Sequence, residues 1–216
     1  PNFDLHGISI NFNGIVIGAS GSGKTNVLGN LLEQFTNTFN QLYIFTQESE
    51  PIYDFIQDTI PNHAINIYYE GYRGFLKSLK NKDDLFIGQS LVIFDDMVAE
   101  KRQDAIEEHF IRGRKRSQTK GQGCSTLYLS QGYTEVPQLI RHQCTLIIII
   151  KITDNSQLTR ILKKYSMTVS KEQLINMYNY CVDGTFGNFF LIDTKQNDDL
   201  KKFRKCFSEY LDPADF

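Results

Sequence analysis

The stretch GASGSGKT at residues 18–25 decides the fold of this chain. It fits the pattern GxxxxGK[ST], in which glycines let backbone N–H groups turn inward around phosphate oxygens. Such a loop needs a strand before it and a helix after it. Residues 15–17 are apolar and suit a strand, and the apolar residues of 24–35 recur at helical spacing. Because both flanks are correct, we predict a nucleoside triphosphate site rather than a chance glycine loop.

The polar groups of this loop have separate expected tasks. The residues expected to bind the nucleotide are Gly18, Gly21, Ser22, Gly23, Lys24 and Thr25. Lys24 should reach the β- and γ-phosphates, and the Thr25 hydroxyl should bind Mg²⁺. The dipole of the following helix adds positive potential at its first turn. ATP and Mg²⁺ are therefore the expected cofactors.

Outward from this loop, short apolar runs alternate with helical patterns. The predicted strands are 14–18, 42–46, 65–69, 91–95, 125–130, 145–152 and 188–192. The predicted helices between them are 24–35, 52–59, 72–79, 101–111 and 136–142. Most of the runs are continuously apolar, as strands buried on both faces are. The alternation predicts an α/β fold with a mostly parallel central sheet and helices on both faces.

The sequence pattern changes after residue 152, where helix signals replace the alternation of strands and helices. Asp154 and Ser170 resemble helix N-caps, and Ser170 with Gln173 forms a capping-box pattern. Apolar residues at 200, 203, 207 and 210 predict a final helix over 199–211. No linker, repeat or low-complexity segment interrupts the chain. We therefore predict one domain over 1–216, with a core at 14–152 and a helical and strand extension at 153–216.

Two acids end the apolar run LVIF at residues 91–94. Parallel α/β sheets bind ligands at the carboxyl ends of their strands. Asp95 is the natural partner of Mg²⁺ through water, and Asp96 is the candidate to polarise the attacking water. A pair of solvated acids is the plain alternative, but the position about seventy residues after a phosphate loop favours catalysis.

A polar residue also follows the strand predicted at 125–130. Gln131 stands at the strand tip, where a glutamine can sense the γ-phosphate and hold the water that attacks it. A simple polar loop residue is the alternative, and the place of Gln131 in the strand sequence favours the sensor.

Three segments together resemble a known family. They are GASGSGKT at 18–25, LVIFDDM at 91–97 and STLYLSQGYTEVPQLIRHQCTLIIIIK at 125–151. The chain resembles the DNA-packaging ATPases of poxviruses, other large DNA viruses, virophages and polinton-type elements, within the FtsK–HerA superfamily. The third segment is the most specific, and the resemblance covers roughly residues 14–151.

The resemblance implies a RecA-like fold, a homo-oligomeric ring of five or six subunits, and ATP-driven movement of double-stranded DNA into a capsid. It also implies capsid or portal-vertex partners and a location in the cytoplasm of the infected cell, in the virus factory or with the virion. It assigns Lys24 and Thr25 to phosphate and Mg²⁺, Asp95 to the metal, Asp96 to the water and Gln131 to sensing. The superfamily often has Glu at the position of Asp96, so Glu48 is a second candidate base.

The segment RGRKRSQTK at 112–120 holds five basic residues, and no acid occurs from 112 to 134. Two functions compete for this basic loop. The loop follows the helix after Asp96 and precedes the strand of Gln131, so we predict that it lies near the carboxyl ends of the strands. There Arg114 or Arg116 could reach a neighbouring subunit's ATP as an arginine finger. The loop could instead contact DNA phosphates without reading bases. A solvated basic surface is the plain alternative, and Arg141 is a weaker finger candidate.

The composition limits which partners the chain can have. The net charge is −2, so attraction to a nucleic acid must come from a local patch. Four widely spaced cysteines, at 124, 144, 181 and 206, favour reduced, mostly buried thiols over a metal site. The longest apolar run, 146–150, is too short to cross a bilayer, and residues 1–13 lack a signal-peptide pattern, so no membrane partner is expected.

Two other functions remain open from the residues. A small-molecule kinase would need an acceptor pocket and an arginine-rich lid, which the basic loop could imitate. A kinase has no need of the water-handling pair Asp96 and Gln131, however. An assembly protein whose oligomeric state is controlled by ATP is the third class.

Overall fold

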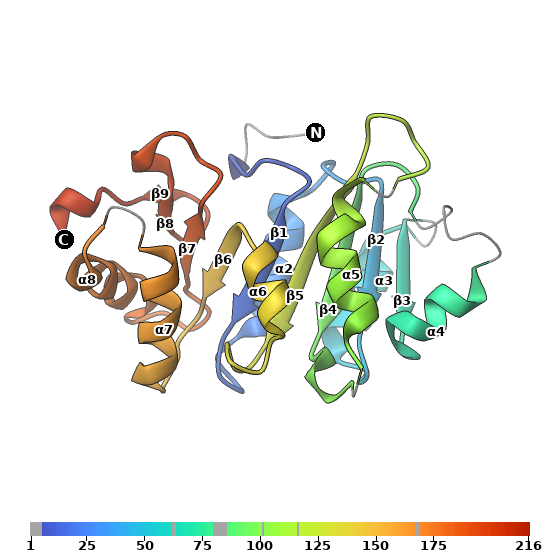
Figure 1. Ribbon diagram of the computed structural model, residues 1–216, viewed down its shortest axis with the longest axis horizontal. Helices are drawn as coiled ribbons and strands as arrows, with labels where there is room; N and C mark the ends of the chain where they lie inside the picture. Colours follow the sequence, from blue (N-terminus) through green and yellow to red (C-terminus); the bar gives the residue numbers. More distant parts are fainter. Residues whose placement is uncertain (1–5, 62–63, 80–85, 101, 116, 167–168) are drawn as a thin grey trace.

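A nine-stranded sheet forms the body of the computed structural model, which describes residues 6–61, 64–79, 86–100, 102–115, 117–166 and 169–216 (Figure 1). The strands are β1 (Asn13–Ile17), β2 (Gln41–Phe45), β3 (Ile65–Tyr68), β4 (Ser90–Asp95), β5 (Cys124–Ser130), β6 (Leu146–Ile149), β7 (Phe190–Asp193), β8 (Phe203–Lys205) and β9 (Glu209–Tyr210). Their order is β3-β2-β4-β5-β1-β6-β7-β8-β9. In this order, the six strands from β3 through β1 to β6 pair in parallel, and the strands from β6 to β9 pair antiparallel.

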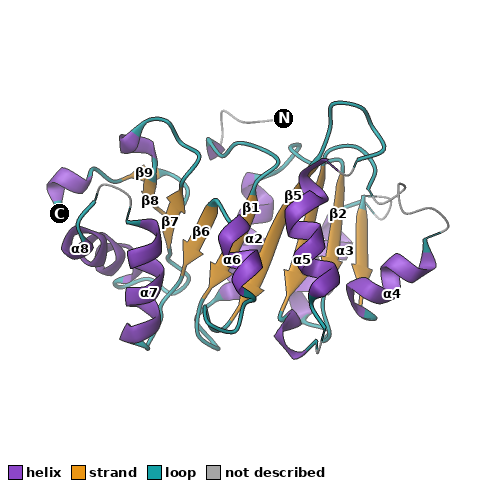
Figure 2. Ribbon diagram, in the orientation of Figure 1, coloured by secondary structure: helices purple, strands orange, loops and turns teal. Residues whose placement is uncertain are grey.

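Helices cover both faces of the sheet (Figure 2). One face carries α2 (Lys24–Gln34) and α3 (Pro51–Thr59). The other carries α4 (Gly71–Ser78), α5 (Asp104–Arg112), α6 (Gln138–Gln143), α7 (Asn155–Tyr165) and α8 (Lys171–Val182). Successive side chains of a strand enter opposite cores: Ile15 and Ile17 pack under the second set, and Val16 under the first. None of the helices in the described part is long and apolar enough to span a bilayer.

The predicted core elements are confirmed. All seven predicted strands are present, as β1 to β7, and their ends differ by up to three residues from the predicted ranges. The five predicted helices of the core are α2 to α6, although α5 begins at Asp104 rather than at 101, which lies outside the described residues. Ser170 and Gln173 make both bonds of the capping box at α8. The fold is the predicted α/β sheet with helices on both faces, of the RecA-like P-loop type.

The predicted final helix over 199–211 is wrong. The segment forms a short turn of 3-10 helix, then β8, a reversal at Cys206 and β9. Phe203 and Phe207, four residues apart, pack on opposite faces of the sheet. The apolar spacing that suggested one helical face therefore reflects two separate cores, reached because β8 pairs with β7 and extends the sheet.

The four cysteines are free, as predicted, and three of them are buried. Burial raises the pKa of the Cys124, Cys144 and Cys181 thiols to about 12 each. Because the thiolate is the reactive form, these three side chains act as small apolar core residues.

Candidate active site

The phosphate loop leaves the carboxyl end of β1 and closes on α2. The Gly18 N–H donates to the carbonyl of Ser130 at 3.3 Å, and the Ala19 N–H donates to that of Lys151 at 3.5 Å, so the tips of β5 and β6 hold the loop. A Cβ on Gly18 would lie 2.4 Å from Ser22 Oγ. Gly23 has a φ of 96°, a left-handed conformation that favours glycine. These two glycines are therefore required by the path of the loop.

Several groups in this loop suit an anion. Gly23 caps α2 without a side-chain hydrogen bond, so the N–H groups of the first turn have no side-chain cap there. Ser22 Oγ is buried and has no hydrogen-bond partner within the described residues. The Lys24 ammonium donates to the carbonyls of Gly18 at 3.0 Å and Ala19 at 3.3 Å, so it lies inside the loop. Donors without acceptors, together with an ammonium and a helix N-terminus, form a phosphate site.

Oxygen ligands gather beside the loop. The Thr25 hydroxyl donates to Glu50 Oε2 at 3.1 Å, and the Tyr53 hydroxyl donates a short bond to Asp95 Oδ2. Both acids contribute to the field at Lys24. Thr25 and Asp95, the two predicted metal ligands, therefore belong to one cluster around the Lys24 ammonium.

This oxygen cluster fits Mg²⁺. In the described part of the chain, no group of three or more His, Cys, Asp or Glu side chains forms a dedicated metal cage. Mg²⁺ in nucleotide-binding sites needs none, because it keeps several waters and is held by one or two protein oxygens plus substrate phosphates. The hydroxyl of Thr25 and the carboxylates of Asp95 and Glu50 supply such oxygens.

The environment of Asp95 changes its acidity. Desolvation by burial raises the pKa of Asp95 to about 6, and the charges of Glu50 and Asp96 add to the rise. The hydrogen bond from Tyr53 and the charge of Lys24 oppose it. Asp95 therefore loses its proton near pH 6 rather than near pH 4 in the protein without nucleotide.

We expect the second-order rate constant kcat/KM for Mg²⁺-ATP to fall about tenfold for each pH unit below about 6, because a protonated Asp95 cannot bind the metal.

The raised pKa of Asp95 also makes the stability of the fold depend on pH, and here low pH is favourable. A raised native pKa stabilises the fold below the unfolded pKa of about 4, and that contribution disappears as the pH rises through about 6. Asp95→Asn should therefore stabilise the protein without nucleotide by roughly 1 to 3 kcal/mol at pH 7.5.

Thermal unfolding of both proteins across the pH range checks this effect. The difference in melting temperature between Asp95→Asn and the wild type should be small near pH 4 and should grow up to about pH 7. A difference that stays constant across this range would contradict the assigned acidity of Asp95.

Asp96 and Gln131 meet at the same end of the sheet. Asp96 adopts a left-handed backbone conformation, with φ 49°, just after β4, and its N–H donates to the Leu129 carbonyl at 3.3 Å. Gln131 Nε2 donates to Asp96 Oδ2 at 3.4 Å, and both side chains are exposed. The structure therefore brings together the two residues that were predicted to handle water.

Sequence reasoning missed Glu50 and Tyr53. Both belong to the start of α3, where Glu50 is the N-cap and Pro51 the first helical residue. Tyr53 is fully buried, and Glu50 contacts Thr25, whereas Glu48 is exposed. The acid directly before a proline marks the helix start in the sequence, but it gives no sign of the contacts with Thr25 and Asp95. Glu50, rather than Glu48, is the acid of this segment that lies at the phosphate loop.

The predicted position of the basic loop is wrong. The loop bonds to the segment that precedes β4: the Ser117 hydroxyl donates to the Gly88 carbonyl at 2.8 Å, and the Gln118 N–H donates to that of Phe86 at 3.0 Å. It therefore lies at the amino ends of the parallel strands, opposite the phosphate loop (Figure 1). The physical reason is that α5 returns along the sheet before β5 begins. Arg114 lies there, and Arg116 lies outside the described residues.

Arg141, the weaker candidate, has a contact within its own chain. Its guanidinium lies over the ring of Tyr133, with 4.9 Å from Cζ to the ring centroid. A cation–π contact of this kind needs no nucleotide to explain the side chain.

Comparison with known proteins agrees with this geometry. A family model described as poxvirus A32 protein matches residues 4–188. Among curated proteins, none matches the chain.

Solved structures share the fold. The genome-packaging NTPase B204 from Sulfolobus turreted icosahedral virus 2, in complex with sulfate, is 15% identical, with a TM-score of 0.65 over 95% of this chain and 100% of that one. The DNA-packaging ATPase B204 from Sulfolobus turreted icosahedral virus is 15% identical, with a TM-score of 0.63 over 92% and 98%. EssC (ATPases 2 and 3) from Geobacillus thermodenitrificans is 16% identical, with a TM-score of 0.55 over 95% and 40%.

The family model spans most of the chain, from residue 4 to residue 188, and so includes the phosphate loop, both acids after β4 and Gln131. The chain belongs to the poxvirus A32 protein family, and its fold and phosphate loop are those of a P-loop nucleoside triphosphatase.

Proposed function

We propose that this protein hydrolyses ATP with Mg²⁺ and uses the energy to move double-stranded DNA, packaging a viral genome into a capsid. The observation that carries the ATPase part is the meeting of the phosphate loop with Asp95, Asp96 and Gln131 at one end of the sheet. The family and the packaging enzymes that share the fold support the DNA part.

In this mechanism the chain's own groups position and polarise the reactants. The Lys24 ammonium moves from the loop carbonyls to the β- and γ-phosphates, and the N–H groups of the loop bind their oxygens. Asp96 accepts a proton from water, and the Gln131 amide, bonded to Asp96, orients that water. Thr25 and Asp95 would hold Mg²⁺, which when bound neutralises charge on the phosphate oxygens.

A basic patch at the amino ends of the parallel strands is the proposed DNA contact. Arg112, Lys115 and Lys120 are exposed, although Arg112 is also paired with Glu108 at 3.3 Å. Lys195, from the segment after β7, lies near Arg114, and its ammonium donates to the Asn11 carbonyl at 3.0 Å. Burial first, and then the nearby charge of Arg114, lowers the pKa of Lys195. Positive charge without a base-reading helix suits contacts with phosphates.

We expect double-stranded DNA of any sequence to stimulate ATP turnover, and expect the variant Lys115→Ala with Lys120→Ala to lose most of that stimulation. Each lost phosphate contact should reduce the slope of log affinity against log salt by about one unit. Lys163→Ala with Lys171→Ala removes the same charge from exposed positions on α7 and α8 and is the matched control. The DNA assignment fails if the first variant and its control have the same affinity and salt dependence.

The active form in this proposal is a homo-oligomeric ring, a pentamer or hexamer, that works with capsid or portal-vertex proteins in the cytoplasm of the infected cell. The proposal keeps an arginine finger that acts on a neighbouring subunit. Its candidates are Arg114, which the structure describes, and Arg116, which lies outside the described residues. Since the basic loop lies opposite the phosphate loop, Arg114 reaches an ATP only on a neighbour that presents the carboxyl ends of its strands. This position favours the DNA role for the loop.

A further inference from the structure

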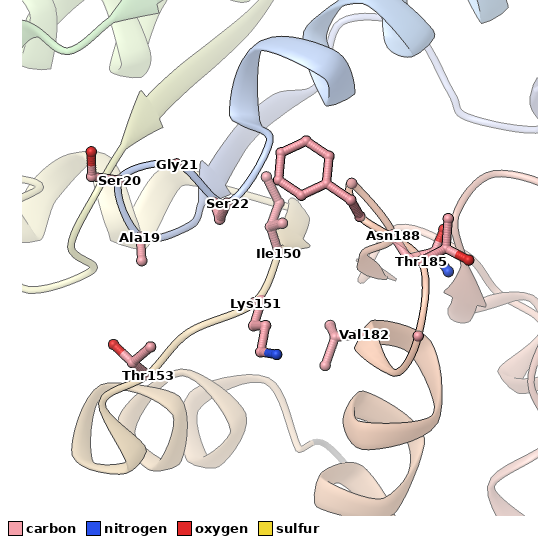
Figure 3. Close-up of a pocket in the computed structure, with 13 residues that line it drawn as sticks. Ala19, Ser20, Gly21, Ser22, Ile150, Lys151, Thr153, Val182, Thr185 and Asn188 are labelled. Carbon is pink, nitrogen blue, oxygen red and sulfur yellow. The ribbon is translucent and has the colours of Figure 1, made fainter.

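A cavity lies beside the phosphate loop, on the side away from the catalytic acids. Its volume is about 340 Å³, which is within the usual range for small-molecule sites. Figure 3 shows its walls: Ala19 to Ser22 of the loop, Ile150 and Lys151 after β6, Val182 at the end of α8, and Thr185 from the connection between α8 and β7. The C-terminal extension therefore forms one wall of this cavity.

The order of the strands fixes how a nucleotide lies across the phosphate loop. β4 and β5, which carry Asp95, Asp96 and Gln131, lie on one side of β1, and β6 and β7 lie on the other. The γ-phosphate must face the acids, because water attacks there. The α-phosphate and the nucleoside then extend toward β6 and β7, where the cavity lies.

Hydrogen bonds with Tyr178 hold the segment at 150–152, which forms one wall of this cavity. The Tyr178 hydroxyl, from α8, accepts a hydrogen bond from the Ile152 N–H at 2.8 Å and donates to the Ile150 carbonyl at 3.4 Å. The Lys151 carbonyl between them accepts the Ala19 N–H. One tyrosine of the extension thus fixes the segment on which the phosphate loop rests.

Phe186 lies at this cavity and is unusually exposed for a phenylalanine. It lines the cavity, yet 66% of its surface is exposed. Gly184 and Gly187, with φ of 84° and 85°, turn the chain tightly on either side of it. A Cβ on Gly23 would lie 3.2 Å from the ring of Phe186, so the ring rests on the start of α2. An exposed ring beside a phosphate site is suited to stacking on a nucleobase.

We propose that the connection between α8 and β7 is the nucleoside subsite of this enzyme, with Phe186 as the surface on which the base stacks. The inference rests on the proposed binding of ATP and deepens it by assigning the base to the C-terminal extension. Stacking uses the face of the base, so the subsite takes the aromatic base of a nucleoside triphosphate and contributes affinity that its phosphates alone lack.

Calorimetric titration with ATP and with inorganic tripolyphosphate tests the subsite, because the second ligand has no base. Phe186→Ala should raise the Kd for ATP by roughly 5- to 150-fold, the range that stacking of one base gives, and should leave the Kd for tripolyphosphate unchanged. Phe186→Tyr, which keeps the ring, should restore ATP affinity. Phe55→Ala is the matched control, since Phe55 is 63% exposed and does not line this cavity.

Two results would overturn the subsite. One is wild-type affinity for ATP in Phe186→Ala, and the other is an equal loss of affinity for ATP and tripolyphosphate, which would mean that Phe186 acts on the phosphate loop itself. Failure of the proposed function has a different signature, because the wild type would then bind neither ligand.

Discussion

Lys24→Ala is expected to reduce ATP turnover by at least about a hundredfold, the usual cost of losing one charge contact in the transition state. The ammonium of Lys24 lies inside the phosphate loop and donates to the carbonyls of Gly18 and Ala19. Burial lowers its pKa, and the charges of Asp95, Asp96, Glu50 and Glu135 oppose that shift. The charges of these four acids thus act at the Lys24 ammonium, and without it their negative charge near the phosphates is no longer offset.

The measurement is steady-state turnover of the purified variant with saturating Mg²⁺-ATP, together with ATP affinity by calorimetry. Lys163→Ala, which removes an exposed lysine from α7, is the control and should behave as the wild type does. Near wild-type turnover in a folded Lys24→Ala protein would refute the assignment of residues 18–25 as the catalytic phosphate loop.

The core of the fold was predictable because its signals are local. The run LVIF at 91–94 is continuously apolar, and β4 is buried on both faces in the structure. Glycines at 18 and 23 stand where the phosphate loop has to bend, so the loop was recognised from the residues alone. Each of these signals lies within a few residues of the feature that it predicts.

The C-terminal segment shows where local signals fail. A spacing of four residues between Phe203 and Phe207 fits a helix, but each ring enters a different core. What decides the segment is pairing with β7, in which Leu191 lies opposite Arg204. Arg204 is fully buried, and its guanidinium donates to the carbonyls of His6 at 2.7 Å and Gly7 at 3.0 Å. Because Arg204 is bonded to residues near the other end of the chain, no local sequence pattern can predict this contact.

The candidate site divides in the same way. Asp96 and Gln131 were predictable as a pair because parallel neighbouring strands bring their tips together. Glu50 and Tyr53 were not, because their contacts depend on β2 lying next to β4. The basic loop was placed at the wrong end because its position depends on the return path of α5 rather than on its residues.

The structure makes Asp96 and Glu50 rival candidates for the catalytic base, and matched variants separate them. Asn tolerates the left-handed backbone of Asp96 and keeps an oxygen for the Gln131 amide, so Asp96→Asn should preserve the local structure. Gln at position 50 likewise keeps an acceptor for the Thr25 hydroxyl. Each variant therefore removes a negative charge and a proton acceptor with little change of shape.

Asp96→Asn is expected to bind ATP as the wild type does and to hydrolyse it about a hundredfold or more slowly, because general base catalysis typically contributes that much. Glu50→Gln should mainly weaken the dependence on Mg²⁺, since Glu50 contacts the residue assigned to the metal. Glu48→Gln, at an exposed position of the same segment, is the control and should be silent. Single-turnover kinetics separate hydrolysis from binding. If Asp96→Asn keeps its turnover while Glu50→Gln loses it at saturating Mg²⁺, then Glu50 is the base, and Asp96 has the lesser task of holding Gln131 in place.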